Sequence, residues 1–279
     1  MLNSRKKHGI YIVYIVLIIF ALMTLFPIII TVLSGFKARA QLRVNLFGLP
    51  NPVIWTNFWD VLDPKRSEFF LNLFNSVIVM VFTVGIDLIL VCLAGFALSR
   101  IKFLGREVIF NYFLLGLLFP LAVAILPLYV VLRTVGLLNM HLGVIIPQVA
   151  FFMPYHIMLA RGFFMQIPFE LEEAATIDGC GRFRFLTTMI MPLSTPVLTT
   201  IAVIAMVTSW NNYFLPLIVL NDAKLFTLPM GVMKFYGQYT IDWSLILAFL
   251  TLAMIPAIVF YILAQKYIVA GLTGGAIKQ

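Results

Sequence analysis

The chain has 279 residues, of which 62% are apolar and only 11% are charged. Soluble globular domains are about half apolar and about a quarter charged, so this composition excludes a water-soluble domain. The formal net charge of +8 does not indicate nucleic-acid binding, because the basic residues lie at the ends of apolar stretches and form no stripe interleaved with aromatic residues. We therefore expect an all-α integral membrane protein.

Six apolar stretches are long enough to cross a bilayer, which takes about 20 residues in a helix. They cover residues 10–35, 72–98, 108–132, 142–160, 196–220 and 244–266. The first stretch follows a basic cluster at residues 5–7. It is longer than the roughly 7 to 15 apolar residues of a signal peptide, so we expect an uncleaved span. The six spans predict a single transmembrane domain over residues 1–279.

Basic residues close to the span ends set the predicted orientation. The cluster at residues 5–7 and the Arg100-Ile101-Lys102 turn place the N-terminus inside, because cytoplasmic segments carry an excess of Lys and Arg. Six spans then place the C-terminus inside as well. The segments 161–195 and 267–279 are consequently expected to be a cytoplasmic loop and a cytoplasmic tail.

Cofactor and metal chemistry finds little support in the sequence. His8, His141 and His156 are widely separated and no Cys/His cluster accompanies them, so we expect no metal site. Cys92 and Cys180 are expected to be free thiols, because one lies in a span and the other in a polar loop. The chain lacks the G-x-x-x-x-G-K-[ST] phosphate-binding loop, so we expect it to bind no ATP by that route.

Asp87 is the one acidic residue inside a predicted span. A carboxylate at that depth must be paired, hydrated or protonated. Three roles are open for Asp87: lining a transport pathway, bonding to a neighbouring helix, or binding a partner membrane protein. The sequence offers no second titratable group nearby, which argues against a proton relay.

The loop 161–195 is too long for a turn between neighbouring spans. Pro168 followed by three glutamates favours a helix start, and Gly179 favours a helix end. The loop therefore predicts a short amphipathic helix on the cytoplasmic surface. The face expected to seat against a partner consists of Leu171, Ala174, Ala175 and Ile177.

Within this loop Glu173-Ala174-Ala175 is followed by Asp178-Gly179 and by Ile190-Met191-Pro192-Leu193. This spacing resembles the EAA loop of the membrane subunits of binding-protein-dependent ABC importers, although Cys180, Gly181 and Met191 depart from the commonest residues. The resemblance implies a coupling helix that docks in a cleft of a cytoplasmic ATPase. The residues implied in coupling are Glu172, Glu173, Ala174, Ala175, Asp178, Gly179 and Pro192. Taken alone, Glu173 would be only a helix-start acid, and Asp178 and Gly179 would only shape the loop.

Further matches extend this resemblance along the chain. Asn75-Ser76, Pro127-Leu128-Tyr129 and Trp210-Asn211-Asn212-Tyr213-Phe214 are similar to the carbohydrate-uptake branch of the family. The C-terminal stretch is similar to the tail of the smaller six-span permease of maltose-type systems, which reaches between the two ATPase subunits. The tail residues implied in that interface are Gly271, Leu272, Thr273, Gly274 and Gly275.

The resemblance implies a bacterial inner-membrane permease subunit that is not itself an enzyme. Its expected partners are a second homologous permease, two ATPase subunits that hold ATP and Mg, and an extracytoplasmic solute-binding protein that delivers a sugar or oligosaccharide. Indole rings stack on sugars and amides pair with hydroxyl groups, whereas Asn and Gln also bond helices to one another. The residues that are candidates for the pathway on this basis are Asp87, Asn111, Gln148, Tyr155, Trp210, Asn211, Asn212 and Tyr213.

Three other classes of membrane protein fit the sequence less well. An ion-coupled secondary transporter predicts paired intramembrane charges or inverted repeats, and the sequence shows neither. A membrane-embedded enzyme needs clustered catalytic groups, of which none is visible. A channel agrees with the number of spans alone. The sequence does not indicate which sugar is carried.

Overall fold

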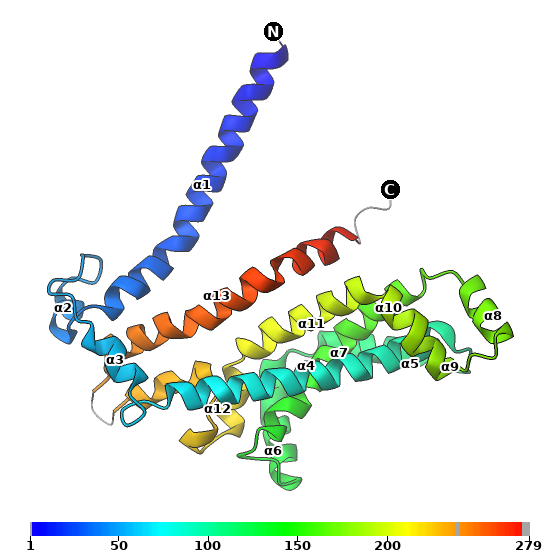
Figure 1. The fold of residues 1–279 in the computed structure, drawn as a ribbon. Coiled ribbons are helices and arrows are strands. Elements are labelled where there is room, and N and C mark those ends of the chain that lie inside the picture. Colours follow the sequence, from blue (N-terminus) through cyan, green and yellow to red (C-terminus); the bar gives the residue numbers. More distant parts are fainter. Residues whose placement is uncertain (1, 238–239, 275–279) are drawn as a thin grey trace. The chain divides into compact units, whose positions relative to one another are not determined.

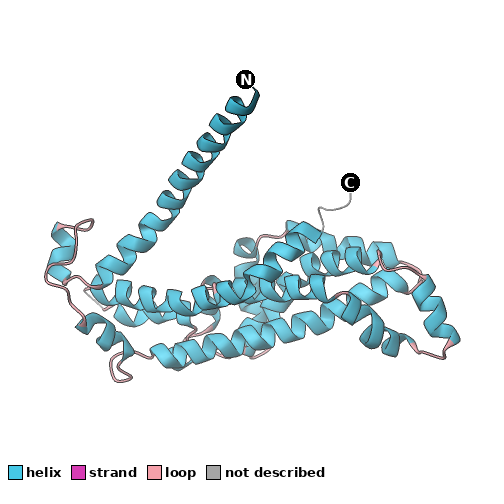
Figure 2. Cartoon of the chain, turned by 45° about the horizontal axis from the view of Figure 1, so that its top comes forward, coloured by secondary structure: helices cyan, strands magenta, loops and turns pink. Residues whose placement is uncertain are grey.

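The computed structural model describes the backbone of residues 2–237 and 240–274, and the side chains of residues 13–237, 240–262 and 265. The described residues form helices joined by loops (Figures 1 and 2), and their only strand-like pairing is an isolated β-bridge between Tyr236 and Ile241. The chain divides into two compact units. One comprises residues 1–70 and 231–256, and the other comprises residues 71–230 and 257–279.

The first unit contains the N-terminal helix and the polar segment that follows it. Its helices are α1 (Leu2–Gly35), α2 (Arg39–Val44), α3 (Thr56–Leu62), most of η4 (Leu228–Phe235) and the first part of α13 (Trp243–Gly274). Lys37 is fully buried, and its Nζ donates to the carbonyl oxygens of Asn45 and Leu46 at 3.3 and 2.6 Å. The amide of Asn57 donates to the carbonyl oxygens of Gly35 and Lys37. These buried donors close the loop behind α1.

The second unit contains the middle of the chain. Its helices are α4 (Phe69–Arg100, from residue 71), α5 (Arg106–Leu115), η1 (Gly116–Leu118), α6 (Leu121–Thr134), α7 (Leu142–Phe164), α8 (Glu170–Ile177), α9 (Arg182–Phe185), the π-helical turn η2 (Leu186–Ile190), α10 (Met191–Leu193), α11 (Thr195–Trp210), α12 (Phe214–Val219), η3 (Ala223–Leu225) and the end of α13. One buried core joins α4, α7, α8 and α11. A second core joins α4, α6, α7 and α12.

Four described helices are long and apolar enough to cross a membrane: Val13–Gly35, Phe69–Arg100, Leu142–Phe164 and Trp243–Ile262. Two bent pairs also qualify, namely Arg106–Leu118 with Leu121–Thr134 at 104° and Arg182–Leu193 with Thr195–Trp210 at 80°. The described part of the chain therefore holds four to six candidate spans.

Two stretches that the sequence predicts as continuous spans are broken. In the stretch 108–132 the break falls at Pro120, because a proline disfavours helical geometry in the residue before it, and Phe119 accordingly has φ −91° and ψ 106°. In the stretch 196–220 helix α11 ends at Trp210 and α12 begins at Phe214. Pro216 then lies in the first turn of α12, where its missing N–H removes no helical hydrogen bond.

Candidate functional site

Helix α8 is the short helix that the sequence predicts in the loop 161–195. It spans Glu170–Ile177, and Gly179 follows it with φ +72°. The N–H of Cys180 donates to the carbonyl oxygen of Ala175 at 2.8 Å, and the N–H of Gly179 donates to that of Thr176 at 3.0 Å. These two bonds form a Schellman motif. The prediction that the helix ends at Gly179 is confirmed.

The two faces of α8 have different environments. Ala175 is buried and Leu171 packs against the same core, so this face holds α8 to its own chain. Glu173 and Ala174 are exposed, and Ile177 is 86% exposed. The prediction of one partner-facing surface from Leu171, Ala174, Ala175 and Ile177 is therefore wrong. Residues four positions apart lie on the same face of a helix. Residues 171 and 175 therefore share the inward face, and residues 173 and 177 share the outward face.

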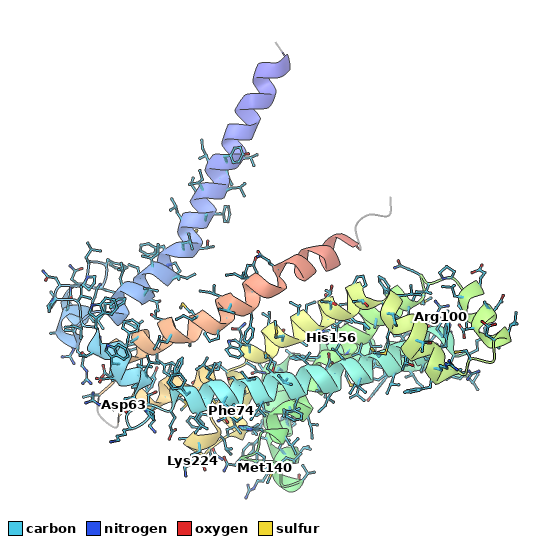
Figure 3. All side chains as sticks on the ribbon, viewed as in Figure 1. Asp63, Phe74, Arg100, Met140, His156 and Lys224 are labelled. Carbon is cyan, nitrogen blue, oxygen red and sulfur yellow. The ribbon has the colours of Figure 1, made fainter. Side chains whose placement is uncertain are left out.

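Arg100, the last residue of α4, reaches the segment that leads into α8 (Figure 3). Its side chain is fully buried, and its guanidinium donates to the carbonyl oxygens of Phe164 and Ile167. The guanidinium carbon lies 4.4 Å from the ring centre of Phe169. Nη1 lies 3.7 Å from Oε2 of Glu172 in α8. One side chain thus contacts the end of α7, the connecting segment and α8.

Arg161 on α7 makes a second buried anchor at the same end of the unit. Its Nη2 donates to both carboxylate oxygens of Glu107 at 2.6 and 2.8 Å, and its Nε donates to the carbonyl oxygen of Leu98 at 3.0 Å. The guanidinium also lies over the ring of Phe110, 3.9 Å from its centre. Arg161 therefore ties α7 to α4 and α5.

Asp87 has a partner that the sequence does not reveal. Nδ1 of His156 on α7 and Oδ2 of Asp87 on α4 are 2.7 Å apart and form a hydrogen bond, and both side chains are buried (Figure 3 labels His156). The expectation that no titratable group lies near Asp87 is wrong. The two residues are 69 positions apart, so only the packing of α4 against α7 brings them together.

Gln148 joins three helices. Its Oε1 accepts hydrogen bonds from Thr83 on α4 at 3.2 Å and from Ser209 on α11 at 2.7 Å, and all three side chains are buried. Thr83 and Asp87 are four positions apart on α4, so they lie on the same face. We refer to Thr83, Asp87, Gln148, His156 and Ser209 as the internal polar network.

The aromatic and amide residues at 210–213 lie at the break between α11 and α12. Trp210 is buried and packs edge-on against Phe260, with the ring centres 4.9 Å apart. Oδ1 of Asn212 accepts from the N–H of Leu215 and so begins α12, whereas Nδ2 of the exposed Asn211 donates to a carbonyl of its own helix. Trp210 and Asn211 line a cavity of about 210 Å³ between α11 and α13.

The remaining predicted pathway residues do not join a common site. Asn111 on α5 is exposed, Tyr155 on α7 is 40% exposed and Tyr213 is 39% exposed. Asp87 and Gln148 are instead part of the internal polar network. Among the described side chains, the candidates thus divide into buried residues that bond helices and exposed residues that face away from the chain.

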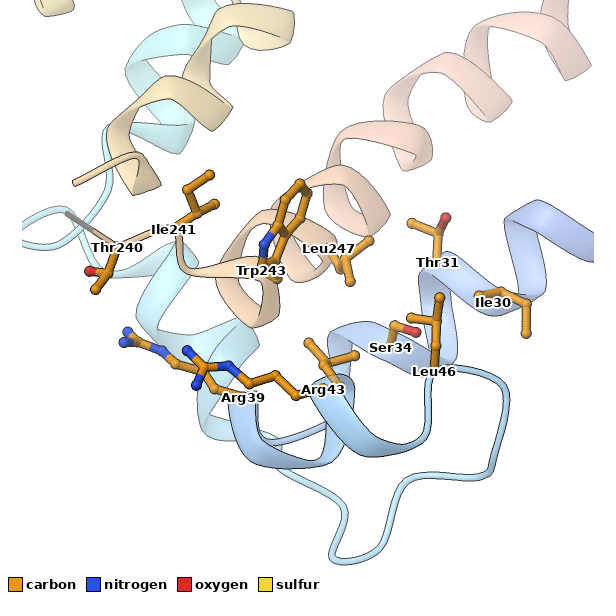
Figure 4. Close-up of a pocket in the computed structure, with 11 residues that line it drawn as sticks. Ile30, Thr31, Ser34, Arg39, Arg43, Leu46, Thr240, Ile241, Trp243 and Leu247 are labelled. Atoms are coloured by element: carbon orange, nitrogen blue, oxygen red, sulfur yellow. The ribbon is translucent and has the colours of Figure 1, made fainter. Parts of the chain in front are cut away.

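A larger cavity of about 780 Å³ lies inside the first unit (Figure 4). It is bounded by the end of α1, by α2 and by the start of α13, and Arg43 and Trp243 line it. Arg39, which also lines it, is ion-paired with Asp242. None of the residues for which the sequence predicts a function lines this cavity.

Three charged or titratable residues that the sequence analysis did not select prove to be structural partners: Arg100, His156 and Arg161. From the sequence, Arg100 is expected only to mark the orientation and Arg161 has no assigned role, since basic residues at span ends are ordinarily exposed. Their burial depends on which helices meet there.

No group of three or more metal-ligating side chains occurs in the part of the chain that the structure describes. Of the predicted tail interface, residues 271–274 continue α13 as backbone, but their side chains and Gly275 lie outside the described residues.

Comparison with known families places these features in context. Residues 90–274 match the family described as "Binding-protein-dependent transport system inner membrane component". The matched region includes α8, the internal anchors Arg100 and Arg161, and the break between α11 and α12.

Individual relatives match over nearly the whole chain. The chain is 34% identical to a putative ABC transporter permease protein of Caldicellulosiruptor sp., covering 95% of this chain and 96% of that protein. It is 33% identical to a probable starch degradation products transport system permease protein of Thermoanaerobacterium thermosulfurigenes, covering 99% and 100%. A solved bacterial ABC transporter involved in the import of the acidic polysaccharide alginate contains a similar chain. The TM-score is 0.81 at 26% identity, covering 95% of this chain and 97% of that one.

Proposed function

Because the chain belongs to the family of binding-protein-dependent transport system inner membrane components, we propose that it forms half of a sugar-import pathway driven by partner ATPases. An extracytoplasmic solute-binding protein delivers the sugar or oligosaccharide, and a second homologous permease supplies the other half. Support for a sugar comes from the names of relatives, which include starch degradation products and arabinooligosaccharide transport permeases.

The observation that carries this proposal is that α8 is packed against its own chain on one face and exposed on the other. Leu171 and Ala175 fix the helix to the core of its own chain, while Glu173, Ala174 and Ile177 remain exposed. An element that transmits motion between two proteins needs both a firm attachment and a free surface. We assign ATPase docking to the exposed face, with Glu172, Asp178, Gly179 and Pro192 shaping the loop around it.

The register between α4 and α7 supports the count of six spans. Thr83 meets Gln148, Asp87 meets His156, and Arg100 meets the end of α7. Residues further along α4 contact residues further along α7, so the two helices run in the same direction. The chain between them must then return across the membrane, so the bent pair of α5 and α6 counts as one span. Together with the basic residues near the span ends, this direction leads us to assign α8 to the cytoplasm.

The pathway between two permeases must be lined by surfaces that a single chain leaves exposed. Asn111, Tyr155, Asn211 and Tyr213 meet that condition, so we assign them to the pathway. Asp87 and Gln148 are buried and bonded within the chain, so we assign them to helix packing. For the tail residues 271–275 we keep the ATPase interface as a proposal. ATP and Mg belong to the partner subunits in this account.

An ion-coupled secondary transporter is the alternative that the Asp87–His156 pair favours, because such transporters use titratable groups paired inside the membrane. The pair removes one argument against that class. Membership in a family of ABC importer permeases outweighs this evidence for an ion-coupled transporter. The internal polar network also gives the Asp87–His156 pair a structural role.

Affinity purification in mild detergent tests the proposal. We expect an ATPase with a phosphate-binding loop and a second permease to co-purify, both identified by mass spectrometry. ATP hydrolysis by this complex should then rise with one of a panel of malto-, arabino- and chito-oligosaccharides in the presence of the solute-binding protein. Recovery of the chain alone, with uptake into liposomes driven by a proton gradient, would contradict the proposal and support the alternative.

A further inference from the structure

Helix α8 has few attachments to the rest of its unit. Its one buried side chain is Ala175. The hydrogen bonds of the described residues that involve α8 are local to the helix and its caps. Beyond the core contacts of Leu171 and Ala175, the charged contact of Glu172 with Arg100 is what joins α8 to another helix. The orientation of α8 therefore depends on a small number of side chains.

Arg100 occupies the position from which that orientation can be set. The last carbonyl groups of a helix lack partners within the helix and carry its negative dipole end. Arg100 donates to one such group, the carbonyl of Phe164, and to the carbonyl of Ile167 in the connecting segment. A cation in this place therefore stabilises the end of α7 and fixes the chain that leaves it.

The same guanidinium then contacts the start of α8. It lies over the ring of Phe169, the residue immediately before the helix, and 3.7 Å from Glu172 in its first turn. A planar guanidinium can serve carbonyl groups in its plane and an aromatic ring on its face at the same time. The contacts of Arg100 thus run from the end of α7 through the connecting segment to α8.

We propose that Arg100 is a positioning residue for the coupling of transport to ATP hydrolysis, because it fixes the angle at which α8 leaves α7. A displacement of α8 by the ATPase is then passed to α4 and α7 together. The role in coupling rests on the function proposed above for α8, whereas the positioning of α8 by Arg100 can be measured independently of it.

The variants follow from the contacts. Arg100→Met keeps the length of the side chain and removes its charge and hydrogen bonds. Arg100→Lys keeps the charge, but a compact ammonium cannot make the planar set of contacts. Glu172→Gln removes one contact and leaves the two carbonyl bonds. Lys102→Met is the matched control, because Lys102 lines the same open hollow of about 770 Å³ beside α8 and is exposed.

Spin labels measure the positioning directly. The full chain, purified together with its bound subunits, carries labels at Ile177→Cys and Leu104→Cys, two exposed positions at the end of α8 and in the loop after α4. Cys92 and Cys180 are replaced by Ala. We expect one narrow distance distribution in the parent and in Lys102→Met. The distribution should be about twice as wide in Arg100→Met, intermediate in Arg100→Lys and only slightly wider in Glu172→Gln.

Hydrolysis rates measure the consequence for coupling. In Arg100→Met the rise in ATP hydrolysis caused by the loaded solute-binding protein should fall roughly tenfold, the factor expected when the hydrogen bonds of a charged group are lost. The basal rate should remain in Arg100→Met, and both rates should remain unchanged in Lys102→Met.

Each outcome decides one point. An unchanged distance distribution in both Arg100 variants overturns the proposal, as does equal broadening in Lys102→Met. Broadening in the Arg100 variants with no ATPase bound to the parent chain supports positioning by Arg100 and contradicts the coupling function. If Arg100→Met does not accumulate in the membrane, Arg100→Lys and Glu172→Gln decide in its place.

Discussion

Helix α8 and the internal polar network are both polar features of a largely apolar chain, and they use their polar groups in opposite ways. The side chains of the network form hydrogen bonds with one another: Asp87 with His156, and Gln148 with Thr83 and Ser209. Helix α8 is held on one face and leaves Glu173 exposed on the other. A polar residue with a partner in its own chain holds helices together, and an exposed one is free to meet another molecule.

The largest expected effect is in the network. Asp87→Ala leaves a buried His156 without its partner, and a buried polar group that loses its hydrogen-bond partner costs about 1 to 3 kcal/mol of stability. We expect a lower midpoint of thermal unfolding in detergent and less protein in the membrane. The double variant Asp87→Leu with His156→Leu should recover much of the loss. Loss of uptake in Asp87→Ala at unchanged thermal stability would show instead that Asp87 lines the pathway.

The second prediction reverses one charge on the exposed face of α8. Glu173→Lys should reduce sugar uptake roughly tenfold, because an unfavourable charge at a docking surface weakens association. The unfolding midpoint should hardly change, since substitutions on exposed surfaces usually alter stability by less than about 0.5 kcal/mol. Glu170→Lys is the matched control, an exposed glutamate on the same helix outside the EAA pattern. Equal loss in both variants would contradict a specific role for Glu173.

A third test concerns the end of α8. Gly179 has φ +72°, and a Cβ added there meets no atom within 4 Å. The loss of stability in Gly179→Ala therefore comes from the left-handed backbone conformation alone and should be about 1 kcal/mol. We expect a partial loss of stimulated ATP hydrolysis. Gly181→Ala is the control, because Gly181 has φ −70° and equal space. Identical behaviour of the two variants would remove the argument for the Schellman ending.

The smallest effects separate the neighbouring asparagines. Asn212→Ala removes the acceptor that begins α12 and should cost about 0.5 to 1 kcal/mol of stability. Asn211→Ala should alter stability by less than about 0.5 kcal/mol, because its side chain is exposed and bonds only to its own helix. If Asn211 lines the pathway, this variant changes the concentration dependence of uptake. Unchanged uptake kinetics in Asn211→Ala would remove it from the pathway.

Local features of the fold were predictable from the sequence. Apolar stretches of sufficient length indicated the long helices, because the requirement to satisfy backbone groups in a bilayer leaves few alternatives. The position of α8 and the positive φ of Gly179 followed from helix-start and helix-end residues. These features depend on neighbours in sequence, so the sequence contains the information directly.

Contacts between distant helices were not predictable. The pairing of Asp87 with His156 depends on which faces of α4 and α7 meet, and the burial of Arg100 depends on where α7 ends. Local patterns in a single sequence do not reveal which helix faces meet. The sharp bend at Pro120 is an intermediate case, because proline indicates a break without giving its angle.

Site-specific photocrosslinking tests the central claim most directly. A photoreactive benzoylphenylalanine replaces Ile177 on the outward face of α8 in the intact complex, and Leu104, an exposed position in the loop after α4, serves as the control. We expect a crosslink from position 177 to an ATPase subunit and a much weaker one from position 104. Absence of the crosslink at 177 in a complex that retains its ATPase would contradict the role of α8 as the coupling helix.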